Sequence, residues 1–162
     1  MKKYFFIACL LLGSVATFAQ RDLGYRGSLD LSVGYGIKSG STFLAGLSTV
    51  HGYQAAPFLF FGVGVAAYEL DSDAGYNSGL AVPVFGDIRI DMGAGKFSPF
   101  IDVRCGYDFT SMNGLYLSPS IGMHYAKSDN FGYNLGIGYE HQASDSGAGA
   151  LGYLALKFGI DF

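Results

Sequence analysis

The 162-residue chain has no tryptophan, two cysteines, four prolines and few charged residues. Only 14% of its residues are charged, whereas as many as 16% are aromatic. These values exclude a disordered chain, because disorder needs high charge and few aromatic residues. The formal net charge of -3 argues against a nucleic-acid-binding protein, which needs a basic surface. The 25 glycines do not indicate collagen, because they follow no Gly-X-Y repeat and proline is scarce.

Residues 1–19 have the pattern of a secretory signal peptide. Two lysines precede an apolar segment, residues 4–12, that is too short to span a bilayer as a helix. Small residues then precede Gln20, the predicted first residue of the mature protein. Cys9 lies inside the apolar segment, which argues against a lipoprotein. The sequence therefore predicts export of a single domain, residues 20–162.

The mature chain has neither a disulfide nor a long hydrophobic run. Cys105 is its one remaining cysteine, so an intramolecular disulfide is excluded. Its longest apolar run, residues 55–68, is interrupted by Pro57 and two glycines. No run reaches the roughly 18 residues of a transmembrane helix.

What is present is an alternation of apolar residues with small or polar ones. In segment 28–37, Leu29 and Leu31 fall on one side of a strand and Asp30 falls on the other. A period of two is typical of a strand with one apolar face. The pattern predicts eight strands, at 28–37, 41–53, 58–69, 80–91, 97–110, 115–125, 131–142 and 153–162.

The length and number of these strands indicate the fold class. Strands of roughly 10–13 residues exceed the five or six that are typical of soluble sheets. They match the roughly 9–11 residues that cross a membrane at a tilt of about 45°. An even number of antiparallel strands also closes a barrel with both termini at one end. We therefore predict an all-β fold, an eight-stranded antiparallel up-and-down transmembrane β-barrel.

Charged residues indicate which face of the barrel points inward. The apolar face carries Leu, Ile, Val, Phe and Tyr side chains. Their combined volume is more than the interior of an eight-stranded barrel can hold. A lysine or arginine facing lipid at the midplane costs about 2–4 kcal/mol, so the charged face is expected inside. The expected lumen charges are Asp30, Asp87, Arg89, Asp91, Asp102, Arg104, Asp108, Glu140, Lys157 and Asp161. The alternative is a soluble barrel with the apolar face inside.

Aromatic residues near the strand ends are typical of the two girdles that flank the apolar band of a membrane barrel. The expected girdle residues are Tyr25, Tyr53, Phe97, Tyr107, Phe109, Tyr125, Phe131 and Tyr139.

Several motifs together resemble a known family. They are His51–Gln54 with Pro57, Gly62–Gly64, Pro83–Arg89, Ser98–Phe100, Pro119–Gly122, Leu135–Tyr139 and the closing Phe158–Phe162. In order and spacing they resemble the small outer membrane protein beta-barrel domain family, akin to OmpA- and OmpX-type eight-stranded barrels, over most of residues 25–162. The resemblance implies a location in the outer membrane of a double-membraned bacterium, in contact with lipid and lipopolysaccharide. It also implies recognition by the barrel assembly machinery through the C-terminal Phe162.

The resemblance brings no catalytic motif, and the expected role is structural or envelope-related. The sequence predicts no catalytic residue, no cofactor and no metal site. Two alternatives stay open. The opposed charges of Asp87, Arg89, Asp102 and Arg104 suit a narrow channel or small-ligand carrier. Loops 70–79 and 143–149 suit a surface binding module.

An enzyme that modifies lipid would need a histidine beside a serine and a carboxylate at the external rim. Glu140 and His141 are neighbours there, but the alternation directs them to opposite faces. Ser144 and Ser146 lie outside regular strand positions. The sequence therefore disfavours an active site at this rim.

The remaining polar features also have simple explanations. By the same alternation His124 points into the lumen, whereas His51 and Cys105 lie on the apolar face. The acidic segment 71–77 lacks the bidentate glutamate of a calcium loop, because Val82 stands at the twelfth position.

Overall fold

In the computed structural model the chain folds into a closed barrel of eight strands. The structure describes residues 23–37, 41–72, 79–93, 96–110, 113–128, 131–144 and 150–162. The labelled strands are β1 (Gly24–Gly36), β2 (Ser41–Ala56), β3 (Leu59–Ser72), β4 (Gly79–Ala81), β5 (Pro83–Asp91), β6 (Phe97–Asp108), β7 (Gly114–Ser128), β8 (Phe131–Ala143) and β9 (Ala150–Asp161). β4 and β5 form a single barrel strand, because both pair with β3 and Val82 alone separates them.

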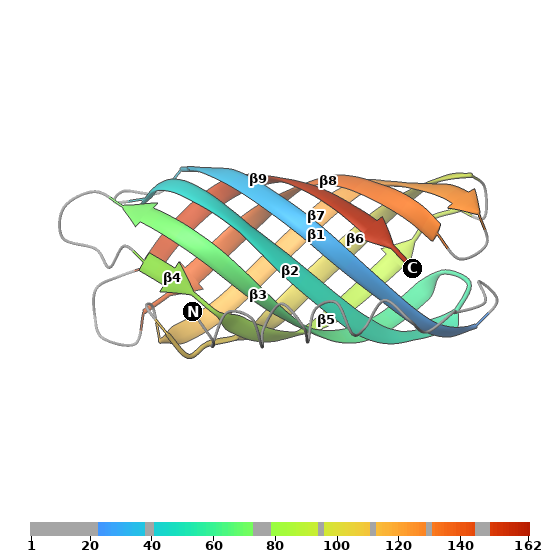
Figure 1. Ribbon diagram of the computed structural model, residues 1–162, viewed down its shortest axis with the longest axis horizontal. Helices are drawn as coiled ribbons and strands as arrows, with labels where there is room; N and C mark the ends of the chain where they lie inside the picture. Colours follow the sequence, from blue (N-terminus) through green and yellow to red (C-terminus); the bar gives the residue numbers. More distant parts are fainter. Residues whose placement is uncertain are drawn as a thin grey trace, which may run out of the picture.

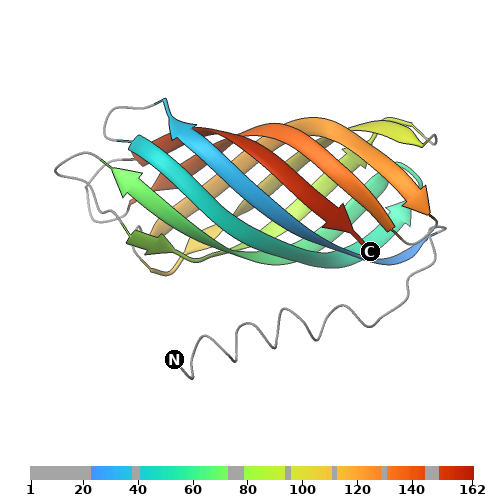
Figure 2. The same ribbon diagram turned by 45° about the horizontal axis from the view of Figure 1, so that its top comes forward.

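Antiparallel pairing between neighbours closes the sheet. Each strand pairs with the next along the chain, and β9 pairs with β1. The strands slant across the long axis of the barrel (Figure 1). β1 begins and β9 ends at the same end of the barrel, as expected for an even number of strands (Figure 2). The predicted all-β, eight-stranded antiparallel barrel is confirmed.

All eight predicted strands are present, but several extend into the expected connections. β1 begins at Gly24 instead of residue 28, and its pairing with β2 starts at Gly24 and Gln54. β3 continues to Ser72, so the first part of the predicted loop 70–79 is strand. Backbone hydrogen bonds hold a ladder together without an alternating side-chain pattern, and this is why the pattern underestimated the strand lengths.

Three predictions concern residues outside the described ranges. These are the signal peptide at 1–19, most of loop 70–79 and most of loop 143–149, of which Ala143 belongs to β8. Within the part of the chain that the structure describes, no helix has the length and apolarity needed to cross a membrane.

The outer face of the barrel is apolar around its circumference. Large exposed side chains come from every barrel strand and include Leu31, Val33, Leu47, Val63, Ile88, Val103, Ile121, Ile137 and Leu156. The orientation predicted for a membrane barrel is confirmed, and a barrel with this face inside is excluded.

The predicted girdle residues lie toward the two ends of the outer face. Tyr25, Tyr53, Phe97, Tyr125 and Phe131 are near the end that holds the start of β1, whereas Tyr107, Phe109 and Tyr139 are near the other end. We call these ends the terminal end and the loop end. Phe97 and Tyr125 are register partners with ring centroids 4.9 Å apart.

Candidate functional site

The lumen gathers the charged residues of the barrel. All ten predicted lumen charges are buried, and each of them is at most 8% exposed. They alternate with exposed residues: in β5 every second residue from Pro83 to Asp91 is buried, and the residues between them are exposed. Arg26 also points inward and pairs with lumen carboxylates, although it was not among the predicted residues. Arg26 lies between Tyr25 and Gly27, before residue 28 where the predicted strand began, and was therefore missed.

Ion pairs link the lumen charges into a continuous chain. At the terminal end, Arg26 lies 3.0 Å from Asp91 Oδ2 and 3.1 Å from Asp161 Oδ2. Arg89 continues the chain, at 3.3 Å from Asp161 Oδ1 and 3.4 Å from Asp102 Oδ2. Asp161 on β9 thus joins Arg26 on β1 to Arg89 on β5 across the lumen.

Arg104 forms the central junction of this chain. Its Nη2 atom lies 3.4 Å from Asp102 Oδ2 and 2.6 Å from Asp30 Oδ2. Its Nε atom lies 3.6 Å from Asp87 Oδ2, and Nη1 donates a hydrogen bond to Ser48 at 3.0 Å. Asp87 and Arg104 are direct cross-strand partners, which places their side chains next to each other in the lumen.

Each of the three arginines in the ion-pair chain also lies over an aromatic ring. The guanidinium carbon of Arg89 is 4.7 Å from the ring centre of Phe100. The corresponding distances are 5.4 Å for Arg104 over Phe85 and 5.7 Å for Arg26 over Phe60. Cation–π contacts of this kind stabilise a desolvated arginine, and the rings fill space that water would otherwise occupy.

A second ion pair lies on the β8–β9 side of the lumen. Lys157 Nζ is 2.8 Å from Glu140 Oε1 and donates to Ser118 Oγ at 2.6 Å. Ser118 in turn donates to Glu140 at 2.9 Å. Glycines surround this pair, and a Cβ atom on Gly138 would lie 3.2 Å from Lys157 Cε. A residue without a side chain is therefore accommodated best at position 138.

Toward the loop end, apolar residues close the lumen. They belong to a buried cluster that extends along the lumen as far as Phe60 near the terminal end. The cluster comprises Leu44, Val50, Phe60, Ala66, Tyr68, Leu70, Ala81, Phe85, Tyr116, Leu151 and Tyr153. Tyr68 and Tyr116 share a hydrogen bond of 3.1 Å, and neither side chain is exposed. We call Leu44, Leu70, Tyr68, Tyr116, Leu151 and Tyr153 the apolar plug. An eight-stranded barrel has room for such side chains but not for a wide aqueous pore.

The plug was not predicted. The expected lumen was small and charged, yet Leu44 and Val50 are fully buried inside it. A signal was present in the sequence, because these two residues break the alternation of segment 41–53. Asp108, near the same end, is also fully buried and accepts hydrogen bonds from the backbone of Val82 at 2.9 Å and Thr110 at 3.0 Å.

Several buried polar atoms of the lumen have no hydrogen-bond partner among the described residues. They include both amide atoms of Gln142, Oε2 of Glu140, and the hydroxyl groups of Ser32 and Ser120. Buried polar groups are normally bonded to protein or to ordered water. Gln142 lies beside the plug, as the register partner of Tyr116 and Leu151, whereas Ser32 and Ser120 lie farther toward the terminal end. Isolated water molecules at these two heights would satisfy the polar atoms.

Among the described residues of the loop end, Glu140 and His141 point to opposite faces of the barrel. Glu140 is fully buried in the lumen, whereas the His141 ring stacks on Tyr139 at the outer face, with ring centres 6.0 Å apart. The predicted opposite orientation is confirmed. Ser144 follows β8, and Ser146 lies outside the described residues.

The other histidines also lie where the alternation predicted. His124 points inward, with Nε2 3.5 Å from Asp161 Oδ2. His51 is on the outer face, where its ring nitrogens contact the Tyr25 hydroxyl and, at 3.1 Å, the Thr49 hydroxyl. Cys105 is exposed on the outer face, as expected.

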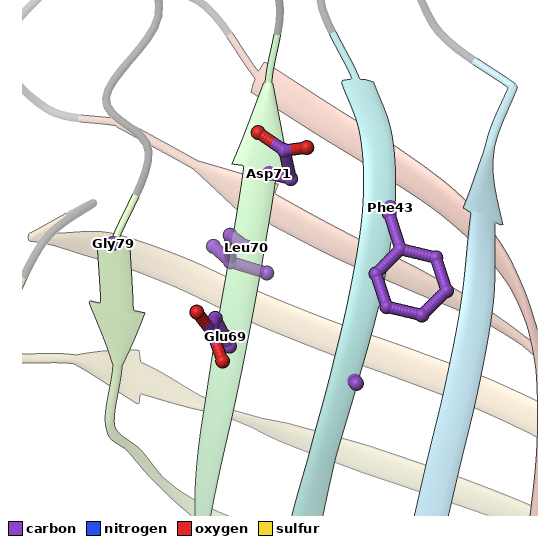
Figure 3. A pocket seen from close by; sticks show the side chains of 6 residues that line it. Phe43, Glu69, Leu70, Asp71 and Gly79 are labelled. Atoms are coloured by element: carbon purple, nitrogen blue, oxygen red, sulfur yellow. The ribbon is translucent and has the colours of Figure 1, made fainter.

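An acidic depression lies on the outer face at the loop end of β2, β3 and β4. Figure 3 shows Glu69 and Asp71 on β3 and Phe43 on β2, three of the residues that line this depression. The volume of the depression is about 460 Å³. Among the described residues, no group of three or more histidine, cysteine or acidic side chains is arranged to hold a metal ion.

No protein-family model and no curated protein sequence matches the chain. Solved structures do. A de novo designed transmembrane β-barrel matches with a TM-score of 0.53 and 17% identity, over 89% of this chain and 98% of the designed one. Neisserial surface protein A (NspA), from Neisseria, matches with a TM-score of 0.56 and 14% identity, over 86% of this chain and 95% of that one. At these identities the similarity is one of fold, that of small eight-stranded membrane barrels.

Proposed function

We propose that the protein is a small integral outer-membrane β-barrel with a structural or envelope-related role, without catalytic activity and with a lumen closed to solutes. The observation that carries this proposal is the filled lumen. A chain of ion pairs occupies its centre and the apolar plug covers its loop end. A continuous apolar outer face supports the membrane location, because water would disfavour so large an exposed apolar area.

The location proposal includes export and assembly. Residues 1–19 would direct the chain across the inner membrane, and Phe162 would present the C-terminal aromatic residue that the assembly machinery recognises. Lipid and lipopolysaccharide would then contact the outer face. The finer relation to OmpA- and OmpX-type barrels is part of the same proposal and is supported by the shared fold.

Cell fractionation with a gel-shift assay tests the location. The washed outer-membrane fraction should contain a band that migrates differently with and without boiling, because a closed barrel resists detergent until heated. A protein that stays soluble without detergent and shows no shift would contradict the proposal.

A conductance measurement distinguishes a lumen that is closed to solutes from a narrow channel. The ion-pair chain and the unpartnered polar atoms are the features that favour a channel. In planar lipid bilayers we expect the wild-type barrel to be electrically silent. A steady conductance that changes when Arg89 or Arg104 is replaced by glutamine would instead support the channel.

A further inference from the structure

Among the described residues, the ion-pair chain of the lumen holds more carboxylates than cations. It joins three guanidinium groups to five carboxylates, those of Asp30, Asp87, Asp91, Asp102 and Asp161. Lys157 does not make up the difference, because its ammonium group lies 2.8 Å from Glu140. His124 lies 3.5 Å from Asp161, and even a charged imidazole there would leave one negative charge in excess. Because a buried charge needs a partner of opposite sign, a further positive charge is expected in the lumen.

Asp87 is a carboxylate of this chain with little compensation for its charge. It is 2% exposed, and neither of its oxygens has a hydrogen-bond partner among the described residues. Its contact with Arg104 Nε is 3.6 Å long. Asp30, which is buried to the same degree, lies 2.6 Å from Arg104 and also accepts hydrogen bonds from Ser28 and Asn134. The surplus negative charge is therefore concentrated at Asp87.

The register of β5, β6 and β7 brings further oxygen atoms to the same part of the lumen. Asp102 contacts the guanidinium group that Asp87 also contacts, with 3.4 Å between its Oδ2 atom and Arg104 Nη2. Ser120 is the direct cross-strand partner of Asp102, so the two side chains are neighbours on the inner face. Asp102 Oδ1 and Ser120 Oγ are both buried and have no hydrogen-bond partner among the described residues. Together with the two oxygens of Asp87 they make four such oxygen atoms.

This set of oxygen atoms suits an alkali-metal cation. Water molecules would satisfy the oxygens but would not supply the missing charge. A calcium ion takes roughly 6–8 oxygen ligands, and a magnesium ion keeps several of its water molecules. The rings of Phe85 and Phe100, which lie over Arg104 and Arg89, restrict the space for such a hydration shell. Two carboxylates and one hydroxyl group are also fewer than the three or more acidic, histidine or cysteine side chains of a multivalent metal site, of which the described residues form none.

We propose that the lumen binds one alkali-metal cation, sodium or potassium, at the carboxylates of Asp87 and Asp102 and the hydroxyl group of Ser120. The cation supplies positive charge that the ion-pair chain lacks, and it links β5, β6 and β7 from inside the barrel. Because the unfolded chain does not form this site, the bound cation stabilises the folded state. The proposal is independent of the closed lumen proposed above, since a resident cation stabilises the barrel whether or not solutes cross it.

Thermal unfolding of the barrel in an uncharged detergent tests the proposal. At constant pH and ionic strength, the unfolding temperature should be higher in sodium or potassium chloride than in N-methylglucamine chloride, whose cation is too large for the filled lumen. It should also rise as sodium replaces N-methylglucamine step by step, because binding to the folded state alone stabilises that state by mass action. Equal unfolding temperatures in the three salts would overturn the proposal.

Two matched pairs of variants locate the cation. Asp87→Asn should remove the dependence on sodium, whereas Asp108→Asn, a change of an inward carboxylate outside the ion-pair chain, should keep it. Ser120→Ala, which leaves every charge in place, should raise the sodium concentration that gives half of the effect. Ser32→Ala also removes a buried hydroxyl group without a hydrogen-bond partner among the described residues, and should leave that concentration unchanged. The same sodium dependence in Ser120→Ala as in the wild type, or in a folded Asp87→Asn, would overturn the proposal.

Discussion

The aromatic ring of Phe162 covers the α-carbon of Gly27 at the seam where the last strand meets the first. The two residues exchange backbone hydrogen bonds of 2.7 and 2.9 Å. A Cβ atom added to Gly27 would lie 2.5 Å from Cε2 of the Phe162 ring, well inside the carbon–carbon contact distance of about 3.5–4.0 Å. The C-terminal side chain thus occupies the space that a side chain at position 27 would need.

Replacing Gly27 by alanine should weaken the closing seam, because the ring of Phe162 must move away. We expect the gel shift of the folded barrel to be lost at a lower temperature than in the wild type. Gly86→Ala is the control, since a Cβ atom there would meet its nearest neighbour, the carbonyl oxygen of Cys105, at 3.9 Å. Equal shifts in the two variants would contradict the role of the Gly27–Phe162 contact.

Arg104→Met should destabilise the barrel strongly. The substitution leaves Asp30, Asp87 and Asp102 without their shared cation in a site that is 1% to 2% exposed. Breaking a buried ion pair by removing one partner costs about 3–5 kcal/mol. Reversible urea unfolding in detergent measures the change, with Lys96→Met at an exposed turn as the control. A loss no larger than that of the control would show that the ion-pair chain does not stabilise the lumen.

The hydrogen bond inside the apolar plug can be isolated with conservative variants. Tyr68→Phe and Tyr116→Phe each remove one hydroxyl of the 3.1 Å contact and should each cost about 1 kcal/mol of unfolding free energy. The double variant should cost less than the sum of the two, because both changes remove the same bond. Tyr53→Phe, which changes an exposed ring of the outer face, is the control. Strict additivity would mean that the two hydroxyls act independently.

Cys105 reports on the environment of the outer face. It is exposed on β6, two residues before the girdle residue Tyr107, and is the one cysteine in residues 20–162. In lipid vesicles we expect it to react with a lipid-soluble thiol reagent but not with a charged one. Lys96→Cys in the Cys105→Ser background is the control for a position at the barrel end. Rapid labelling of Cys105 by the charged reagent would contradict a membrane-embedded outer face.

The orientation of the side chains was predictable from the sequence because it is a local property of a strand. Successive residues point to opposite faces, so the alternation around Asp30, Asp102 and Lys157 was enough to direct all of them into the lumen. The charged residues then showed which face points into the lumen, because a charged residue that faces lipid is costly. Arg26 was missed because the predicted strand began at residue 28, and Leu44 was missed because it is an apolar residue on the inward face.

Which residues meet inside the lumen was decided by the tertiary structure. Arg26 and Asp161 are 135 positions apart in sequence, and Asp30 and Arg104 are 74 positions apart. Their contacts depend on the stagger between strands and on closure of the barrel, which set the height of every inward residue along the axis. No local pattern encodes that height, so the ion-pair chain and the apolar plug arise only when all eight strands have closed.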